Sequence, residues 1–166
     1  LGIVLNKYSA GEADAFFPIY TKDYGKIRAY AQGVKKESAK LKGHLETFNF
    51  VELRCVQGKN GIRLTSAQAL ESWPSIRSDF EKSRAAYLTT EFIDRTCLEG
   101  ERDEKLWELL LNNFFLLERG LSMRPELQHL LAEFEAGVFQ ALGFGESKNS
   151  AEIPSIAHVF EKGYNE

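Results

Sequence analysis

Apolar and polar positions alternate with a period of two in the first seventy residues, which turn formers interrupt at intervals of roughly 8 to 12 residues. The turn formers are Gly11, Gly25, Gly33, Gly43, Gly58 and Gly61. Alternation of this kind predicts short strands, which we expect at residues 2–8, 15–20, 25–32, 48–56 and 61–69. Asn60 and Gly61 form the residue pair favoured in two-residue hairpin turns. Strands so short and so closely spaced predict a small β-barrel.

In the third and fourth of these strands the alternation separates two faces. The third strand sets Ile27, Ala29 and Ala31 against Lys26, Arg28 and Tyr30. The fourth sets Val51, Leu53 and Cys55 against Phe48, Phe50 and Arg54. The two phenylalanines either offer stacking surfaces or lie beneath a loop or the next domain, because exposed Phe pairs are unusual.

From Trp73 onward the period changes to 3.6 and glycines become rare, which predicts helices. We expect a first helix capped by Ser75 and fading near Cys97. Its apolar positions are Ile76, Phe80, Tyr87, Leu88 and Phe92. A second helix should run from about Asp103 to Gly120, with the stripe Leu106, Leu109, Leu110, Phe114 and Leu117. A third should begin at Pro125 and end at Gly143, before a short amphipathic piece at residues 154–160. Three such helices predict a compact bundle.

The change of period divides the chain into a barrel over residues 1–72 and a helical domain over residues 73–166, an α+β arrangement. Composition is that of a globular protein, 43% hydrophobic and 12% aromatic, with no apolar run near the roughly 18 to 20 residues of a membrane helix. We therefore expect a cytoplasmic protein. Cys55 and Cys97 lie in apolar stretches and should be reduced core thiols. Because residue 1 is Leu, we expect a short N-terminal piece to be missing.

Charge is unevenly distributed behind the net value of −3. Residues 1–70 hold 11 Lys and Arg against 6 Asp and Glu, a net charge of +5, whereas residues 71–166 hold 10 against 18, a net charge of −8. The cations gather at Lys22, Lys26, Arg28, Lys35, Lys36, Lys40 and Lys42, among Tyr20, Tyr24, Tyr30 and Phe48. A cationic block mixed with aromatic rings suits a polyanion with stackable bases, so the N-terminal third is predicted to bind nucleic acid.

Between the third and fourth strands, residues 33–43 hold four lysines against one glutamate between two glycines. We name these residues the basic loop. Such runs are common on surfaces without a ligand, so a solvated loop is the alternative to a binding loop. Continuity with Lys26 and Arg28 favours binding.

Catalytic and metal-binding motifs are weak, and we do not predict an enzyme. His44, His129 and His158 lie far apart, and neither HExxH nor CxxC occurs. Gly25-Lys26 lacks the preceding glycine and the following Ser or Thr of a P-loop. Helix carboxylates such as Asp79, Glu81, Glu91 and Asp94 have the spacing of a solvated face.

The segment from Thr21 to Phe48 resembles the N-terminal region of the RecO family. It shares a strand ending in Gly-Lys-Ile-Arg, a lysine-rich loop, and Leu41-Lys42-Gly43 followed by Leu45, with Thr47 where the family commonly has proline. The segments 67–73, 86–93, 134–135 and 142–145 resemble the helical part of that family in the same order.

The resemblance implies an OB-fold joined to a helical domain, without catalysis and without a cofactor. It implies a bacterial, nucleoid-associated recombination mediator that binds single- and double-stranded DNA and anneals complementary strands. The implied partners are RecR and the acidic C-terminal tail of the single-strand-binding protein SSB, in a process that loads RecA.

Three departures from the family pattern change what we expect. Residues 147–150 hold none of the cysteines that form a zinc site in many members, so we predict no zinc. The helical domain is shorter than in many members, so we expect it to lack the contacts that their longer C-terminal part makes. Leu131-Ala132-Glu133-Phe134 lacks the common arginine, so SSB binding should be weak or use Arg119 and Arg124.

Two hypotheses follow. In the first, a mediator binds DNA through phosphate contacts from Lys26, Arg28, Lys35, Lys36, Lys40, Lys42 and Arg63, with Tyr24, Tyr30 and Phe48 as stacking residues. In the second, an adaptor docks RecR or SSB and scarcely touches DNA, as the acidic helical half and the net charge of −3 would favour.

Overall fold

The computed structural model describes residues 1–36, 39–59, 61–121, 123–143 and 155–162. The chain forms two compact units. The first consists of Leu1–Ser72 together with Ile93–Arg102, and the second of Trp73–Phe92 together with Asp103–Glu166. A short piece from the middle of the helical sequence thus belongs to the barrel unit.

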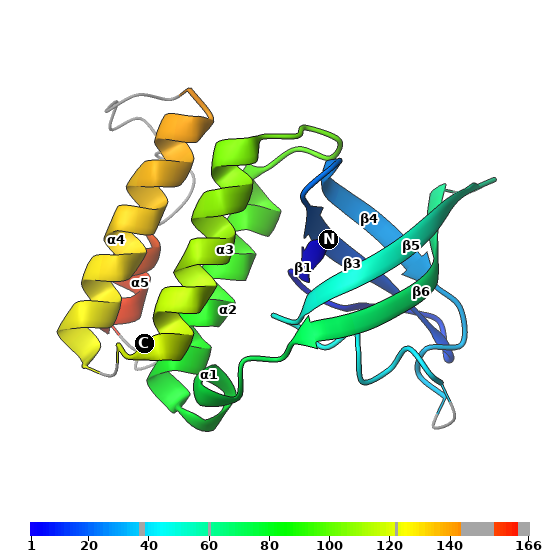
Figure 1. Cartoon of the computed structure of the whole chain (residues 1–166), viewed down its shortest axis with the longest axis horizontal. Helices are drawn as coiled ribbons and strands as arrows, with labels where there is room; N and C mark the ends of the chain where they lie inside the picture. Colours follow the sequence, from blue (N-terminus) through cyan, green and yellow to red (C-terminus); the bar gives the residue numbers. More distant parts are fainter. Residues whose placement is uncertain (37–38, 60, 122, 144–154, 163–166) are drawn as a thin grey trace. The chain divides into compact units, whose positions relative to one another are not determined.

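The first unit is built on a six-stranded sheet (Figure 1). Its strands are β1 (Gly2–Val4), β2 (Tyr8–Ala10), β3 (Asp14–Thr21), β4 (Gly25–Ala31), β5 (Phe50–Gly58) and β6 (Gly61–Glu71). They follow the order β1-β5-β6-β4-β3-β2, and β1 also pairs with β3, so that five strands close into a ring. Pairing is antiparallel except between β4 and β6. The expected α+β arrangement, an OB-like barrel followed by helices, is confirmed.

The first expected strand, residues 2–8, is two strands in the structure. Both β1 and β2 pair with β3, but their registers differ by one residue. The ladder breaks beside Pro18, whose carbonyl accepts a hydrogen bond of 2.9 Å from the Leu5 N–H. Proline has no backbone N–H to donate to the opposite strand, so the regular pattern of hydrogen bonds stops at this point. A break of this kind depends on a residue in the neighbouring strand and is not visible in residues 2–8 alone.

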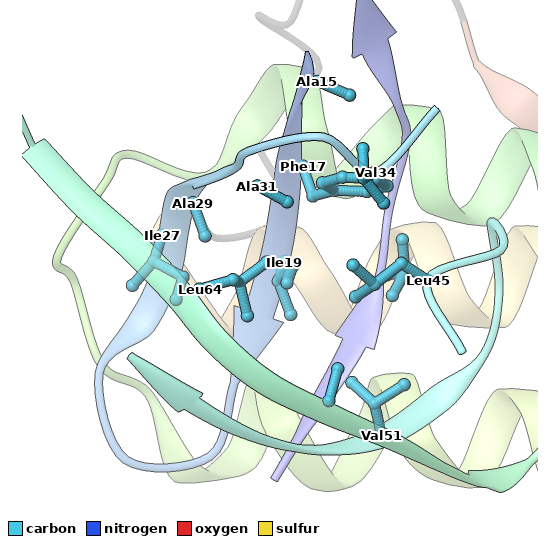
Figure 2. Packing of buried hydrophobic residues seen from close by; sticks show 12 residues of the cluster. Ala15, Phe17, Ile19, Ile27, Ala29, Ala31, Val34, Leu45, Val51 and Leu64 are labelled. Atoms are coloured by element: carbon cyan, nitrogen blue, oxygen red, sulfur yellow. The ribbon is translucent and has the colours of Figure 1, made fainter. Parts of the chain in front are cut away.

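The interior of the barrel confirms the alternation read from the sequence. The buried residues come from every second position of β3 and β4, from β1, β5 and β6, and from the connection between β4 and β5 (Figure 2). They are Val4, Ala15, Phe17, Ile19, Ile27, Ala29, Ala31, Val34, Leu45, Val51, Leu64 and Ala67. The residues between these buried positions of β3 and β4 therefore point out of the barrel.

The β5–β6 hairpin turns one residue earlier than expected. Gly58 pairs with Gly61, so Gly61 begins β6 rather than lying in the turn. Position 60 lies outside the described residues.

The second unit contains most of the helical sequence. The helices are α1 (Pro74–Ser78), α2 (Phe80–Thr96), α3 (Glu104–Arg119), α4 (Arg124–Ala141) and α5 (Ile156–Lys162), with the end of α2 belonging to the barrel unit. The second and third expected helices match α3 and α4. Asp103 caps α3 by accepting a hydrogen bond of 2.9 Å from the Leu106 N–H. No described helix is long and apolar enough to cross a membrane.

The first expected helix is divided into α1 and α2, and the assignment of Ser75 as its cap is wrong. Asp79 is extended, and its carboxylate accepts a hydrogen bond of 3.0 Å from the Lys82 N–H, which starts a new helix. The free backbone N–H groups at the start of α1 instead donate to the side chain of Glu118. Its carboxylate accepts hydrogen bonds from the Ser75 and Ile76 N–H groups at 2.9 and 3.0 Å.

Candidate nucleic-acid interface

The outward faces of β3 and β4 lie side by side and carry rings and cations. Three cross-strand pairs point outward, namely Phe16 with Tyr30, Pro18 with Arg28, and Tyr20 with Lys26. Arg28 is exposed, whereas Tyr20 at the far end is fully buried. The accessible part of this face is therefore its half around Phe16, Tyr30 and Arg28.

Neighbouring strands extend this face into one row of aligned residues. Tyr8 on β2 pairs with Phe16, and Arg63 on β6 pairs with Tyr30. We name Tyr8, Phe16, Tyr30 and Arg63 the outer row. Tyr8 is 44% exposed and Arg63 is exposed. The row thus crosses β2, β3, β4 and β6, from a tyrosine ring at one end to a guanidinium at the other.

The rings of the outer row contact one another and a cation. The centroids of Phe16 and Tyr30 are 5.2 Å apart with a tilt of 54°. The Arg28 guanidinium lies 5.0 Å from the Phe16 centroid, within cation–π range. Stacking fixes the guanidinium beside the rings, a geometry that suits simultaneous contact with a phosphate and a base.

Asp14 holds Tyr30 and the start of the basic loop together. Its carboxylate accepts hydrogen bonds from the Tyr30 hydroxyl and, at 2.7 Å, from the Gly33 N–H. The tyrosine bond and then the Gly33 bond lower the pKa of Asp14, while the same tyrosine bond raises the pKa of Tyr30. A single carboxylate on a cationic surface therefore orients the stacking ring and the loop.

The basic loop rests on the β2–β3 turn at the same end of the barrel. The Lys35 N–H donates to the Ala13 carbonyl at 2.9 Å, and Lys35 Nζ donates to the Gly11 carbonyl at 2.7 Å. The side chains of Lys36, Lys40 and Lys42 are exposed. Because β6 starts beside the end of β4, the β5–β6 hairpin lies at this end as well. The structure brings together Arg28, Tyr30, Lys35 and Arg63 with the described lysines of the loop.

Lys26, in contrast, contacts a carboxylate within the barrel unit. Lys26 Nζ lies 2.5 Å from the Asp94 carbonyl and 3.5 Å from Asp94 Oδ1, and its side chain is only 12% exposed. The Gly100 N–H donates to the Lys26 carbonyl at 2.9 Å, so residues 93–102 cover this end of β4. A phosphate would have to compete with Asp94 for this ammonium group.

Two of the expected stacking residues lie elsewhere. Tyr24 is 70% exposed, but it precedes β4, whereas the basic loop follows β4, roughly 20 Å away at about 3.3 Å per residue. Phe48 precedes β5 with φ of 77°, and its N–H donates to the Val4 carbonyl at 2.9 Å. It is half-buried beside β1 rather than placed on the face of β3 and β4. The structure does not bring either ring to the outer row.

Sequence reasoning missed Tyr8 and Phe16. Phe16 lies beside Phe17 in an apolar run, and only the register with Tyr30 shows that Phe16 points outward while Phe17 fills the core.

Comparison with known proteins identifies the family. Residues 1–73 match the family profile described as "Recombination protein O N terminal", and residues 77–148 match the profile described as "Recombination protein O C terminal". The chain belongs to the RecO family. The two profiles meet near the change from strands to helices.

Several curated RecO proteins are similar to this chain. The DNA repair protein RecO of Gloeobacter violaceus is 31% identical over 157 residues, which cover 95% of this chain and 58% of that relative. The DNA repair protein RecO of Dehalococcoides mccartyi is 31% identical over 142 residues, 86% of this chain and 54% of the relative. That of Acetivibrio thermocellus is 28% identical over 163 residues, 98% of this chain and 63% of the relative. The chain spans 54–63% of the length of these RecO proteins.

The two arginines expected to meet SSB differ in what they contact within the helical unit of this RecO-family chain. Arg124 Nη2 donates to the Phe160 and Glu161 carbonyls at 3.2 and 3.0 Å, at the C-terminal end of α5. Arg119 is exposed, with its guanidinium 5.5 Å from the Phe115 ring centroid. Both side chains are exposed, but the Arg124 guanidinium is engaged by two carbonyls of the same unit, whereas Arg119 contacts a ring face.

The expectation about zinc concerns residues 147–150, which lie outside the described residues. Among the residues that the structure does describe, no group of three or more His, Cys, Asp or Glu side chains could hold a metal ion.

Proposed function

We propose that this RecO-family chain is a non-enzymatic protein of recombinational DNA repair that binds single- and double-stranded DNA on the outer face of its barrel. The relatives that it matches are named DNA repair proteins. One observation carries the proposal: the outer row and the basic loop occupy one end of an OB-like barrel. In OB-folds the face of the second and third strands, with the adjoining loops, holds oligonucleotides, and here β3 and β4 form that face.

Each group on this surface has a distinct part in the proposed complex. Phosphates are held by the accessible cations, which are Arg28, Lys35, Lys36, Lys40, Lys42 and Arg63. Tyr30, supported by Phe16, stacks on a base, and such stacking contributes about 1–3 kcal/mol per base without reading sequence. Lys26, Tyr24 and Phe48 contribute less, because the first is paired with Asp94 and the other two lie away from the row.

The same surface supports annealing. Cations that neutralise phosphates on two strands lower the repulsion between those strands as they pair. Stacking that does not depend on base identity leaves the pairing edges to the complementary strand. We therefore propose that the chain anneals complementary strands and, with RecR, assists the loading of RecA in the nucleoid.

Contact with the SSB tail is a further part of the proposal. An acidic peptide requires an accessible cation, so we assign this contact to Arg119 rather than to Arg124, which already donates to two carbonyls of α5.

Salt dependence tests the proposed DNA face. Fluorescence anisotropy with a labelled oligothymidylate of about 15 nucleotides, close to the site size of one OB-fold, is measured at about 50 and 200 mM salt. About five phosphate contacts to a single strand predict a slope of about −3.5 for log affinity against log salt. The exposed residues Lys36 and Lys40 are then both changed to Glu. Affinity should fall at least about tenfold and the slope should become shallower by about 1.4, because two contacts are lost.

A matched variant controls for net charge. Lys22 and Arg102 are also exposed but lie at the end of β4 opposite the basic loop, since Lys22 precedes β4 and the Arg102 backbone lies beside Gly25; changing both to Glu alters the charge by the same amount. This control should change affinity by less than about threefold. If the two variants weaken binding equally, the basic loop is not the contact surface. If the wild-type chain does not bind DNA even at low salt, the adaptor hypothesis, which the net charge of −3 favours, takes its place.

A further inference from the structure

A pocket of about 250 Å³ adjoins the outer row within the barrel unit. It is lined by Tyr8, Pro18, Lys26, Ile27, Arg28, Asp94 and Glu99. Its walls therefore combine an aromatic ring and apolar surface with two cations and two carboxylates. Neither the phosphate contacts nor the stacking described above makes use of the carboxylates.

Hydrogen bonds fix one side of this pocket. Asp94 accepts from the Tyr8 hydroxyl at 3.1 Å and lies 3.5 Å from Lys26 Nζ, so its carboxylate is already engaged. Glu99 is placed beside Lys26 by a parallel bridge, and the following N–H, that of Gly100, donates to the Lys26 carbonyl. This framework holds Glu99, a residue of the pocket wall, on a fixed piece of backbone.

Two charged groups of the pocket are accessible to a ligand. Glu99 and Arg28 are both exposed. A carboxylate accepts two hydrogen bonds side by side, and a guanidinium donates two in the same way. A flat ligand that offers two adjacent donors on one edge and two adjacent acceptors on another would satisfy both groups.

Among the four DNA bases, guanine has this pattern. Its N1–H and N2–H₂ groups are adjacent donors that match a carboxylate, and its O6 and N7 atoms are adjacent acceptors that match arginine. Thymine presents two carbonyl oxygens separated by one N–H, so it cannot satisfy a carboxylate through two bonds. Adenine and cytosine each carry one exocyclic amine beside ring acceptors, which again leaves the carboxylate with a single partner.

Pocket size favours one base over a longer ligand. Sites for drug-sized ligands measure roughly 300–1,000 Å³, somewhat more than the 250 Å³ found here. The Tyr8 ring and the Pro18 surface supply the apolar contact that an unstacked base requires.

We propose that this pocket binds one unstacked guanine of the DNA strand, with Glu99 accepting from N1–H and N2–H₂ and Arg28 donating to O6 and N7. This inference rests on the proposed DNA binding and adds to it a preference for one base. When a guanine fills the pocket, Arg28 contacts that base instead of a phosphate, and the other cations of the surface hold the phosphates. It predicts that a strand held by phosphates and stacking gains affinity wherever a guanine reaches the pocket.

Substituted oligonucleotides test the preference. Competition anisotropy compares an oligothymidylate of about 15 nucleotides with the same strand carrying a single central guanine, adenine or cytosine. The guanine strand should bind at least about fivefold more tightly than the other three, the lower end of what one bidentate base contact discriminates. Equal affinity for all four strands would overturn the proposal.

A matched pair of variants separates base recognition from charge. Glu99→Gln removes one carboxylate and places an amide donor opposite the guanine donors, whereas Glu52→Gln removes an exposed carboxylate from β5, outside the pocket. Both variants should bind oligothymidylate slightly more tightly, because each removes a negative charge. The ratio of guanine to thymine affinity should fall to about one in Glu99→Gln and stay at its wild-type value in Glu52→Gln. A ratio that keeps its wild-type value in Glu99→Gln would overturn the assignment of Glu99 to the guanine edge, because a charge effect alone changes the affinity for all strands equally.

A separate experiment tests guanine recognition by the pocket independently of DNA-strand binding. The ¹⁵N-labelled chain is therefore titrated with guanosine monophosphate and, separately, with thymidine monophosphate. Saturable shifts around Tyr8, Arg28 and Glu99 with the guanine nucleotide alone would support the pocket even if oligothymidylate did not bind. Absence of these shifts, or equal shifts with both nucleotides, would refute it.

Discussion

A methyl group at Gly25 would separate residues 99–101 from β4. Gly25 adopts φ of +64°, and a Cβ added there would lie 1.9 Å from the Glu101 carbonyl oxygen and 2.4 Å from the carbonyl carbon. Both atoms belong to backbone, so the clash cannot be relieved by a side-chain rotation. The Gly25→Ala chain must move residues 99–101 away and lose the Gly100 to Lys26 hydrogen bond.

The cost of this change can be estimated from its parts. Placing an L-residue in a left-handed conformation costs about 1–2 kcal/mol. Loss of one backbone hydrogen bond adds about 0.5–1.5 kcal/mol, and displacement of the Lys26–Asp94 contact adds to this sum. We therefore expect Gly25→Ala to lower the free energy of unfolding by about 2–4 kcal/mol.

Gly11→Ala provides the matched control. Gly11 adopts φ of +72°, but no described atom lies within 4 Å of an added Cβ. Only the conformational cost applies, about 1–2 kcal/mol. Urea unfolding followed by circular dichroism, with equal m-values for the two variants, measures the difference. If Gly25→Ala costs no more than Gly11→Ala, residues 99–101 are not packed against β4 as described, and the wall of the guanine pocket is lost with them.

Two further predictions concern hydrogen bonds that carboxylates accept. Bonds from Tyr30 and a backbone N–H hold the pKa of Asp14 below its ordinary value of 3.8, so their stabilising effect is present above pH 3.8 and is lost as the pH falls through the lower folded-state pKa. Asp14→Asn should thus be less stable than wild type at neutral pH, and acid titration should narrow that gap; a constant gap would contradict the assignment. Glu118→Gln should cost about 1–2 kcal/mol in urea unfolding, because the amide caps the N–H groups of Ser75 and Ile76 less well, and an unchanged stability would refute the cap.

Local periodicity was sufficient to predict the main elements. Alternation in residues 25–31 predicted that Ile27, Ala29 and Ala31 face inward, and all three are buried in the structure. The 3.6-residue stripes likewise predicted α3 and α4, with Asp103 and Gly120 at the ends of α3. In each case the signal lies within one element, where side-chain direction follows directly from the backbone period.

Features that depend on distant residues could not be predicted in this way. The break between β1 and β2 arises from Pro18 in the neighbouring strand. The N-terminus of α1 is satisfied by Glu118, more than forty residues along the chain. Neither composition nor local periodicity indicates which distant residues contact one another.

The candidate site shows the same limit. Lys26 shares the outward face of β4 with Arg28, as the period requires, but Asp94 lies 68 residues away and occupies its ammonium group. Phe16 became a candidate only once its register with Tyr30 was known. Charge and period thus predicted which surface carries the cations, and strand pairing was needed to decide which of its residues are accessible.

The location of bound DNA is best measured by chemical-shift mapping. The ¹⁵N-labelled chain is titrated with an oligothymidylate of about 15 nucleotides, and the shifts are plotted on the structure. We predict the largest shifts on the outer row, in the described part of the basic loop and at Arg28, with small shifts at Tyr24 and in α3 and α4. Shifts concentrated in the helices or around Tyr24, with the outer row unchanged, would contradict DNA binding by the face of β3 and β4.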